Sequence, residues 1–276
     1  MADPKILFEQ LATQTWERLR LSWEYHISQG EETVTDLLQL EIAQYGKPDI
    51  RVTKTTKRHE AQSGIDWEWW IGDNYSGWLR FAIQAKKINM NGHYPALKHA
   101  VRRPGGRKSL QHNLLKRYAR EKGAVPLYCL FNHVSPLEID ERTHWHCSAD
   151  FDSKQFGCTI SPVGVVEEAL SNRGCRTFDF IHRHDCTFPW RCLFCPQYSA
   201  LPRLLASAAN AISKKPIRYR QLPQALARTR DSDGVFEPAQ LEDRGNNSPV
   251  MPHRTVIIET SLADISDGIS AFTSSE

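Results

Sequence analysis

The sequence GIDWEWW occupies residues 64–70, and FAIQAKK follows at residues 81–87 after the link GDNYSG at residues 72–77. Both stretches are rich in β-branched and aromatic residues, which is typical of strands, whereas the link has the composition of a turn. The pattern therefore predicts a β-hairpin, and the rest of the chain is interpreted around it.

This hairpin has one polar and one apolar face, because side chains on a strand point alternately to opposite sides. We expect Asp66 and Glu68 to share one face of the first strand, and we expect Gln84 and Lys86 to share one face of the second. The apolar face carries Ile65, Trp67, Trp69, Ile83 and Ala85. The polar face is either a solvated surface or a group of functional side chains beside an apolar wall.

The surrounding sequence predicts an α/β fold. Apolar spacing indicates helices at residues 5–28, 31–45, 109–122, 163–172 and 199–212. Strands are expected at residues 50–56, 125–131, 156–161 and 255–260. A short antiparallel meander followed by a helical crossover implies a mixed sheet flanked by helices, with a smaller C-terminal extension.

Three regions are expected along the chain. Residues 1–135 hold the N-terminal helices and the hairpin, and residues 136–214 form an accessory α/β region that contains Cys and His. Residues 215–276 form an acidic tail with little periodicity. We expect this tail to be rich in loops and partly disordered.

The composition, 40% hydrophobic and 24% charged, is ordinary for a soluble globular protein. No apolar run approaches the roughly 18–20 residues of a membrane span. Residues 1–5 do not begin a signal peptide, so we expect a cytoplasmic protein with no membrane partner. Seven cysteines are an odd and modest number, which favours reduced or metal-bound thiols over disulfides.

Positive charge is concentrated next to the hairpin. The segment from Lys86 to Lys122 contains eleven Lys or Arg residues and one acidic residue, Glu121, although the net charge of the chain is only +3. Such a block is common on solvated helices and loops. Its position at the lysine of the hairpin nevertheless favours a surface that binds a polyanion.

Three features in order resemble the PD-(D/E)XK nuclease superfamily: Glu32 on an early helix, Gly64-Ile65-Asp66 at one strand, and Gln84-Ala85-Lys86 at the next. They are most similar to Mrr-type restriction endonucleases, whose last motif is Gln-X-Lys. The resemblance covers about residues 30–132. It implies a restriction-endonuclease-like fold and a metal-dependent endonuclease, with double-stranded DNA as the expected substrate and a role in antiviral defence or restriction.

The resemblance implies a catalytic set of Glu32, Asp66, Glu68, Gln84 and Lys86, with Mg²⁺ or Mn²⁺ on Asp66, Gln84 and Glu32. Phosphodiester hydrolysis needs a nucleophilic water and a cation near the developing negative charge, and Mg²⁺ prefers oxygen ligands. Lys86 can hold the water or the phosphate as a point charge. Glu68 could complete the ligand set.

The helix glutamate is one of three candidates. Ser28 and Glu31 have the spacing of a capping box, which would give Glu31 a structural role and leave Glu32 free. Glu41 lies near the apolar stripe of the same helix. We rank Glu32 first, then Glu31, then Glu41.

Nucleic-acid contacts are expected beyond the catalytic set. Phosphates would be bound by Lys87, Arg102, Arg103, Arg107 and Lys108, and the resemblance places Gln111 along the cleft. The alternative function is a nucleic-acid-binding module without catalysis, since Gln84 stands where many relatives carry an acid. Cutting both strands requires two active sites, which makes a homodimer plausible.

A second cluster of candidate metal ligands lies in the second half of the chain. Cys192 and Cys195 have C-x-x-C spacing, and Cys186, His184 or His182 could complete a tetrahedral Zn²⁺ site. We predict His184, Cys186, Cys192 and Cys195 as ligands. Buried reduced thiols and a redox pair are the alternatives.

Overall fold

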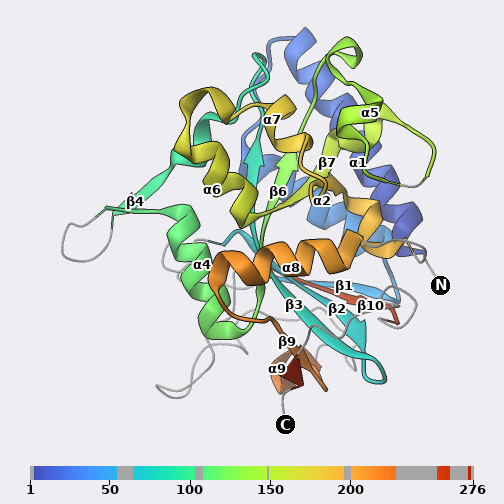
Figure 1. Ribbon diagram of the computed structural model, residues 1–276. Helices are drawn as coiled ribbons and strands as arrows, with labels where there is room; N and C mark the ends of the chain where they lie inside the picture. The colour runs from blue at the N-terminus through green and yellow to red at the C-terminus, as the bar shows by residue number, and fades with distance from the viewer. Residues whose placement is uncertain are drawn as a thin grey trace.

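The structure, a computed structural model, describes residues 3–54, 65–102, 108–147, 149–195, 200–227, 254–261 and 273–274. The fold is mixed α/β, as predicted: nine described strands form one sheet, and helices lie on both of its faces (Figure 1). A separate two-stranded ladder, β4 (Ala100–Arg102) with β5 (Lys108–Leu110), extends away from the body.

The main sheet runs in the order β1-β10-β2-β3-β6-β7-β8. Its strands are β1 (Ile50–Lys54), β10 (Arg254–Glu259), β2 (Trp67–Asp73), β3 (Gly77–Lys87), β6 (Val125–Phe131), β7 (Cys158–Pro162) and β8 (Phe188–Pro189). β10 is parallel to β2 and β3 is parallel to β6, while the other neighbours on this path are antiparallel. β9 (Ile217–Tyr219) pairs with β3 and with β11 (Thr273–Ser274).

The helices begin and end close to the predicted positions. The longer ones are α1 (Pro4–Glu24), α2 (Glu31–Tyr45), α4 (Gln111–Lys122), α6 (Val163–Ser171) and α8 (Ala200–Ile212). The short ones are α5 (Glu141–His144), α7 (Phe178–His182), α9 (Gln224–Ala227), η2 (Pro95–Lys98), η3 (Pro136–Glu138), η4 (Ser153–Gly157), η5 (Arg173–Cys175) and η6 (Trp190–Phe194). α4 connects β3 to the parallel strand β6, which is the expected helical crossover.

β2 and β3 form the predicted hairpin, with Trp67 opposite Ile83. In its turn the Asp73 carboxylate accepts hydrogen bonds from the Tyr75 backbone N–H at 2.9 Å and from the Ser76 hydroxyl at 2.7 Å. Gly72 has a φ of +145°, a backbone conformation that residues with a side chain rarely adopt. The turn residues therefore fix the register of the hairpin.

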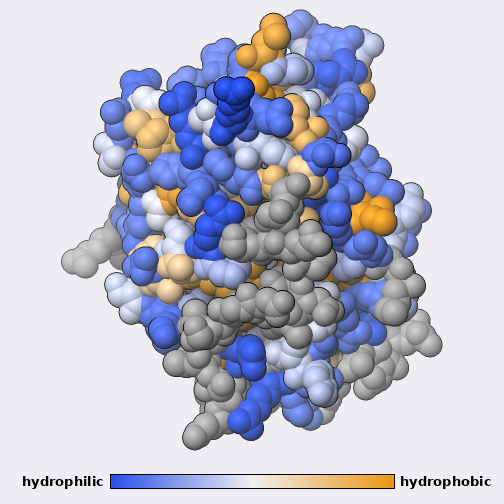
Figure 2. Space-filling view, turned by 45° about the vertical axis from the view of Figure 1, so that its right-hand side comes forward, coloured by the Kyte–Doolittle hydropathy of each residue, from blue (hydrophilic) through white to orange (hydrophobic). Residues whose placement is uncertain are grey.

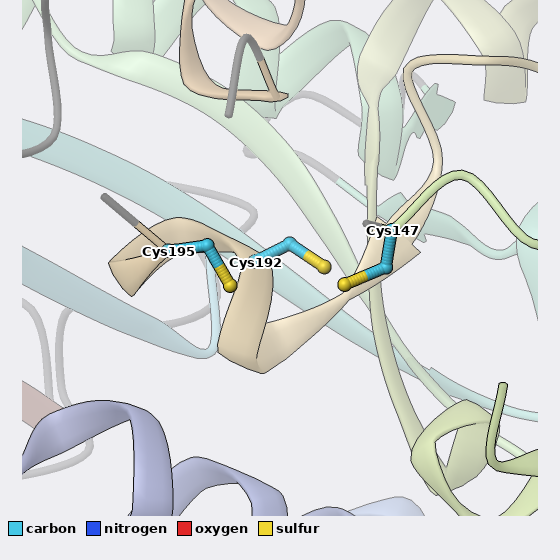
Figure 3. Close-up of side chains that lie close together, drawn as sticks. All are labelled: Cys147, Cys192 and Cys195. Carbon is cyan, nitrogen blue, oxygen red and sulfur yellow. The ribbon is translucent and has the colours of Figure 1, made fainter. Parts of the chain in front are cut away.

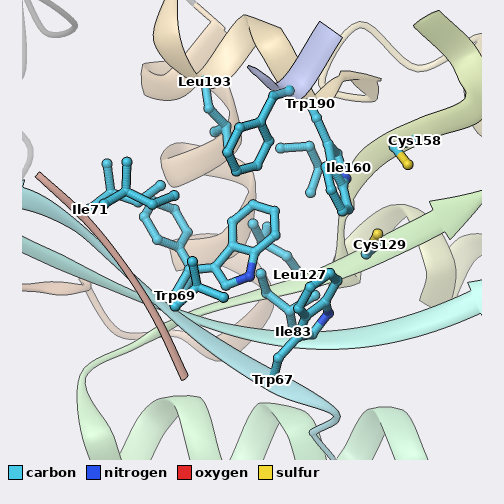
Figure 4. Close-up of a cluster of buried hydrophobic side chains, with 14 of the residues drawn as sticks. Trp67, Trp69, Ile71, Ile83, Leu127, Cys129, Cys158, Ile160, Trp190 and Leu193 are labelled. Carbon is cyan, nitrogen blue, oxygen red and sulfur yellow. The ribbon is translucent and has the colours of Figure 1, made fainter. Parts of the chain in front are cut away.

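The apolar face of the hairpin is a wall of tryptophans, as predicted (Figure 4). Trp69 meets Trp67 edge to face with ring centroids 5.2 Å apart, and it meets Trp190 of η6 at 5.1 Å. α1, α2 and η6 pack against this face, whereas α4 and α6 pack on the other. Ile65 was predicted on the tryptophan face but packs in the opposite cluster, because the regular alternation begins only at Trp67.

Strands from all three predicted regions join the same sheet. β10 confirms the strand expected at residues 255–260, and it lies between β1 and β2 in the interior of the sheet. The boundaries expected near residues 135 and 214 therefore do not separate independent sheets. The tail expected to be rich in loops at residues 215–276 contains β9, α9 (Gln224–Ala227), β10 and β11, and its residues 228–253 lie outside the described residues.

The surface on the side shown in Figure 2 is mostly hydrophilic, and hydrophobic side chains form small, separate spots on it. None of the described helices combines the length and the apolar character that a membrane crossing requires.

Candidate active site

A cavity of about 240 Å³ lies where the last residues of β3 meet the first residues of α2 and β10. Its wall brings together segments that are far apart in the sequence. The lining residues are Glu31, Glu32, Thr35, Asp66, Gln84, Lys86, Ala96, His99, Gln111 and Arg254. Four of the five predicted catalytic residues therefore line one cavity.

Asp66 lies directly before β2, and its carboxylate is held by β3. The backbone N–H of Ala85 donates to Asp66 Oδ2 at 2.6 Å, and the Gln84 side-chain amide donates to the same oxygen. Gln84 is buried, and its Oε1 has no hydrogen-bond partner among the described residues. A buried acceptor without a partner is costly, and Gln84 lies in the wall of the cavity.

Lys86 is paired with a glutamate of α2. The Lys86 ammonium donates to Glu31 Oε2 at 3.1 Å, and the backbone N–H of Lys87 donates to Glu31 Oε1 at 3.1 Å. The Lys86 side chain is only 4% exposed, so the cavity wall contains a desolvated cation with an anionic partner. Glu31 is therefore in contact with Lys86 and Lys87 at the end of β3.

Two of the three candidate helix glutamates, Glu31 and Glu32, line the cavity, so the choice between them stays a prediction. The capping box does not form, because Gly30 precedes α2 and no side chain caps the helix. Glu31 is therefore free to contact β3, whereas Glu32 lines the cavity with its Oε1 3.5 Å from Arg254 Nη2. Glu41 instead pairs with Arg18 at 2.8 Å.

Arg254 is a cavity residue that the sequence did not identify. Its side chain is 1% exposed, and its Nε and Nη2 atoms donate to Asp36 Oδ1 at 3.1 and 2.9 Å. The first residue of β10 thus adds a guanidinium, which suits phosphate oxygens, to the wall of the cavity. The only signal in the sequence was one Arg before the apolar run Val256–Ile258.

Glu68 does not line the cavity, contrary to its predicted role as a ligand. It points to the expected face but lies two residues further along β2, where it accepts hydrogen bonds from Arg80 Nε at 2.6 Å, Trp70 Nε1 at 2.7 Å and the Tyr118 hydroxyl at 2.9 Å. Burial and the adjacent Glu68 charge raise the pKa of Tyr118. Glu68 therefore neutralises the mostly buried guanidinium of Arg80.

The residues predicted to contact nucleic acid differ in their exposure and in their position relative to the cavity. Gln111 lines the cavity, and its Oε1 has no partner among the described residues. Lys87 is half-buried, and burial lowers the pKa of its ammonium group. Lys108 is exposed on β5 and Arg102 ends β4, whereas Arg103 and Arg107 lie outside the described residues.

The structure brings together only two of the four residues predicted as zinc ligands. Cys192 and Cys195 do lie together, but their neighbour is Cys147. Cys186 packs in the cluster of α4 and α6, and His184 Nε2 lies 3.9 Å from Glu168. His184 and Cys186 precede β8, which separates them from η6.

A family model described as a family of unknown function (DUF6615) matches residues 5–270, so the chain belongs to that family. The match spans the sheet from α1 to β10. No curated protein and no solved structure matches the chain.

Proposed function

We propose that this member of the DUF6615 family is a metal-dependent endonuclease that hydrolyses phosphodiester bonds of nucleic acid, with DNA as its substrate. The observation that carries the proposal is the convergence of Asp66, Gln84 and Lys86 in one cavity with Glu31. Their order along the chain resembles the motifs of PD-(D/E)XK nucleases. That resemblance alone suggests a role in defence.

The cavity fits a hard divalent cation. Its candidate ligands are all oxygens: the carboxylates of Asp66, Glu31 and Glu32, and the Oε1 of Gln84, which has no hydrogen-bond partner among the described residues. Mg²⁺ and Mn²⁺ prefer such oxygen donors. When bound, the cation would supply positive charge near the scissile phosphate.

Each residue of the chain has a distinct role in this proposal. Gln84 and the Ala85 N–H fix the orientation of the Asp66 carboxylate. Lys86, positioned by Glu31, orients the attacking water or a non-bridging phosphate oxygen. Arg254 contributes a second cation at the wall, where charge on the transition state develops.

The test is cleavage of supercoiled plasmid DNA in Mg²⁺ or Mn²⁺ by wild type, Asp66→Asn and Lys86→Met. We expect each variant to lose at least about a hundredfold in rate, because both remove charge at the reacting phosphate. Lys47→Ala is a matched control, since this exposed lysine lies past the opposite end of the 15-residue helix α2. Linear product would indicate cutting of both strands, as a homodimer would do, and nicked circles would indicate single-strand cutting.

The alternative is a nucleic-acid-binding module without catalysis. The observation that favours it is the ion pair of Lys86 with Glu31 beside an amide, Gln84, instead of a third acid. This alternative predicts salt-dependent DNA binding that persists in Asp66→Asn and no cleavage by wild type with either metal.

A further inference from the structure

Three cysteine sulfurs meet on the tryptophan side of the sheet, where η6 packs. Cys192 lies in η6, Cys195 follows it, and Cys147 comes from the loop after α5. The three sulfur atoms all lie within 4.8 Å of one another. Figure 3 shows the three side chains pointing toward a common centre.

The local framework holds these cysteines on anchored segments. Arg191, next to Cys192, donates to Glu9 of α1 at 2.9 Å and lies 5.1 Å from the ring of Trp145. Cys192 and Cys195 are buried at 2% and 4% exposure, and none of the three is in a disulfide. The segment that carries Cys192 is therefore held against α1 and against the loop that carries Cys147.

The geometry points to a site for a thiophilic divalent cation: we propose that Cys147, Cys192 and Cys195 bind Zn²⁺. With Zn–S bonds of about 2.3 Å and tetrahedral angles, three thiolates lie about 3.8 Å apart, so binding needs only a small inward movement of the sulfurs. Binding releases the thiol protons to solvent. The described residues add no fourth His, Cys or acidic ligand to this group, so the proposal commits to three thiolate ligands.

The site has a structural consequence for the hairpin. Trp190 begins η6 and packs on Trp67 and Trp69, which form the apolar wall of β2. Zinc on Cys192 and Cys195 would fasten η6 to the loop at Cys147, 45 positions earlier in the sequence. The site thus stabilises the layer behind the hairpin and does not depend on the nuclease proposal.

The experiment is elemental analysis of the full-length chain purified without added zinc or chelator. We expect about one zinc per chain in wild type and a loss of at least about tenfold in zinc affinity in Cys147→Ser. The controls Cys175→Ser and Cys186→Ser remove thiols outside the group and should keep the zinc. A folded wild type that contains no zinc and takes up none on titration would overturn the proposal. An equal loss of zinc in Cys186→Ser and Cys147→Ser would also overturn it.

A second measurement needs no variant. Maleimide labelling of the native wild-type chain, with and without prior zinc removal, reports each cysteine by peptide mass. We expect zinc removal to increase labelling at Cys147, Cys192 and Cys195 and to leave Cys175 unchanged. If zinc removal leaves the labelling of any of these three cysteines unchanged, the result would count against the site.

Discussion

Replacing Glu68 by Gln separates a structural carboxylate from those proposed to be catalytic. Glu68 is 1% exposed and bonds the mostly buried guanidinium of Arg80 at 2.6 Å. Removing one partner of a buried ion pair costs about 3–5 kcal/mol. Gln keeps an oxygen that can accept from Trp70 Nε1, so we expect a loss of about 3 kcal/mol in the free energy of unfolding.

The assay is thermal unfolding monitored by circular dichroism. At about 2.1 cal/mol/K per residue, a chain of 276 residues has an unfolding entropy near 0.6 kcal/mol/K, so the loss lowers Tm by about 5 °C. Tyr118→Phe, which removes only the hydroxyl that donates to Glu68 at 2.9 Å, should cost about 1 kcal/mol. DNA cleavage by folded Glu68→Gln should stay near the wild-type rate. A variant as stable as wild type that has lost metal-dependent cleavage would refute the structural role.

Three further outcomes are expected. Glu31→Gln should slow cleavage more than Glu32→Gln, because Glu31 pairs with Lys86 whereas Glu32 pairs with Arg254; the reverse order in initial rates would support the sequence-based choice of Glu32. Gln84→Glu should lower Tm without metal, since it places a second carboxylate against Asp66, and should give a larger Tm increase with Mg²⁺ than wild type does; equal increases would argue against a metal on Gln84. Burial lowers the pKa of His182 from its usual 6.5 to about 3, so the unfolded chain binds more protons below pH 6.5. Urea unfolding should show stability falling from pH 6.5 towards 3, by at most about 1.4 kcal/mol per pH unit from this group, and an unchanged pH slope in His182→Gln would contradict this.

The hairpin could be predicted from the sequence because its determinants are local. Strand alternation predicted that Gln84 and Lys86 lie on the face of the hairpin away from Trp69, and the structure confirms this placement. Alternation failed only at Ile65, where the strand has not yet begun. The same rule predicted the correct face for Glu68. It could not show that Arg80 pairs with the Glu68 carboxylate or that the Tyr118 hydroxyl donates a hydrogen bond to it.

The remaining site residues depend on contacts between distant parts of the chain. Arg254 reaches the cavity only because β10 enters the sheet beside β2, and no local pattern specifies that pairing. Cys147 meets Cys192 with no recognisable spacing. Glu31 and Glu32 are adjacent in the sequence, and only the packing of α2 against β3 shows that Glu31 pairs with Lys86.

The most direct measurement of the central claim is the initial rate of plasmid cleavage in Mg²⁺ by wild type and Asp66→Asn, both verified as folded. The proposal predicts metal-dependent cleavage by wild type, abolished by chelator, and at least about a hundredfold less in Asp66→Asn. Equal cleavage by the two proteins, or none by wild type with Mg²⁺ or Mn²⁺, would contradict the assignment of this cavity as a nuclease active site.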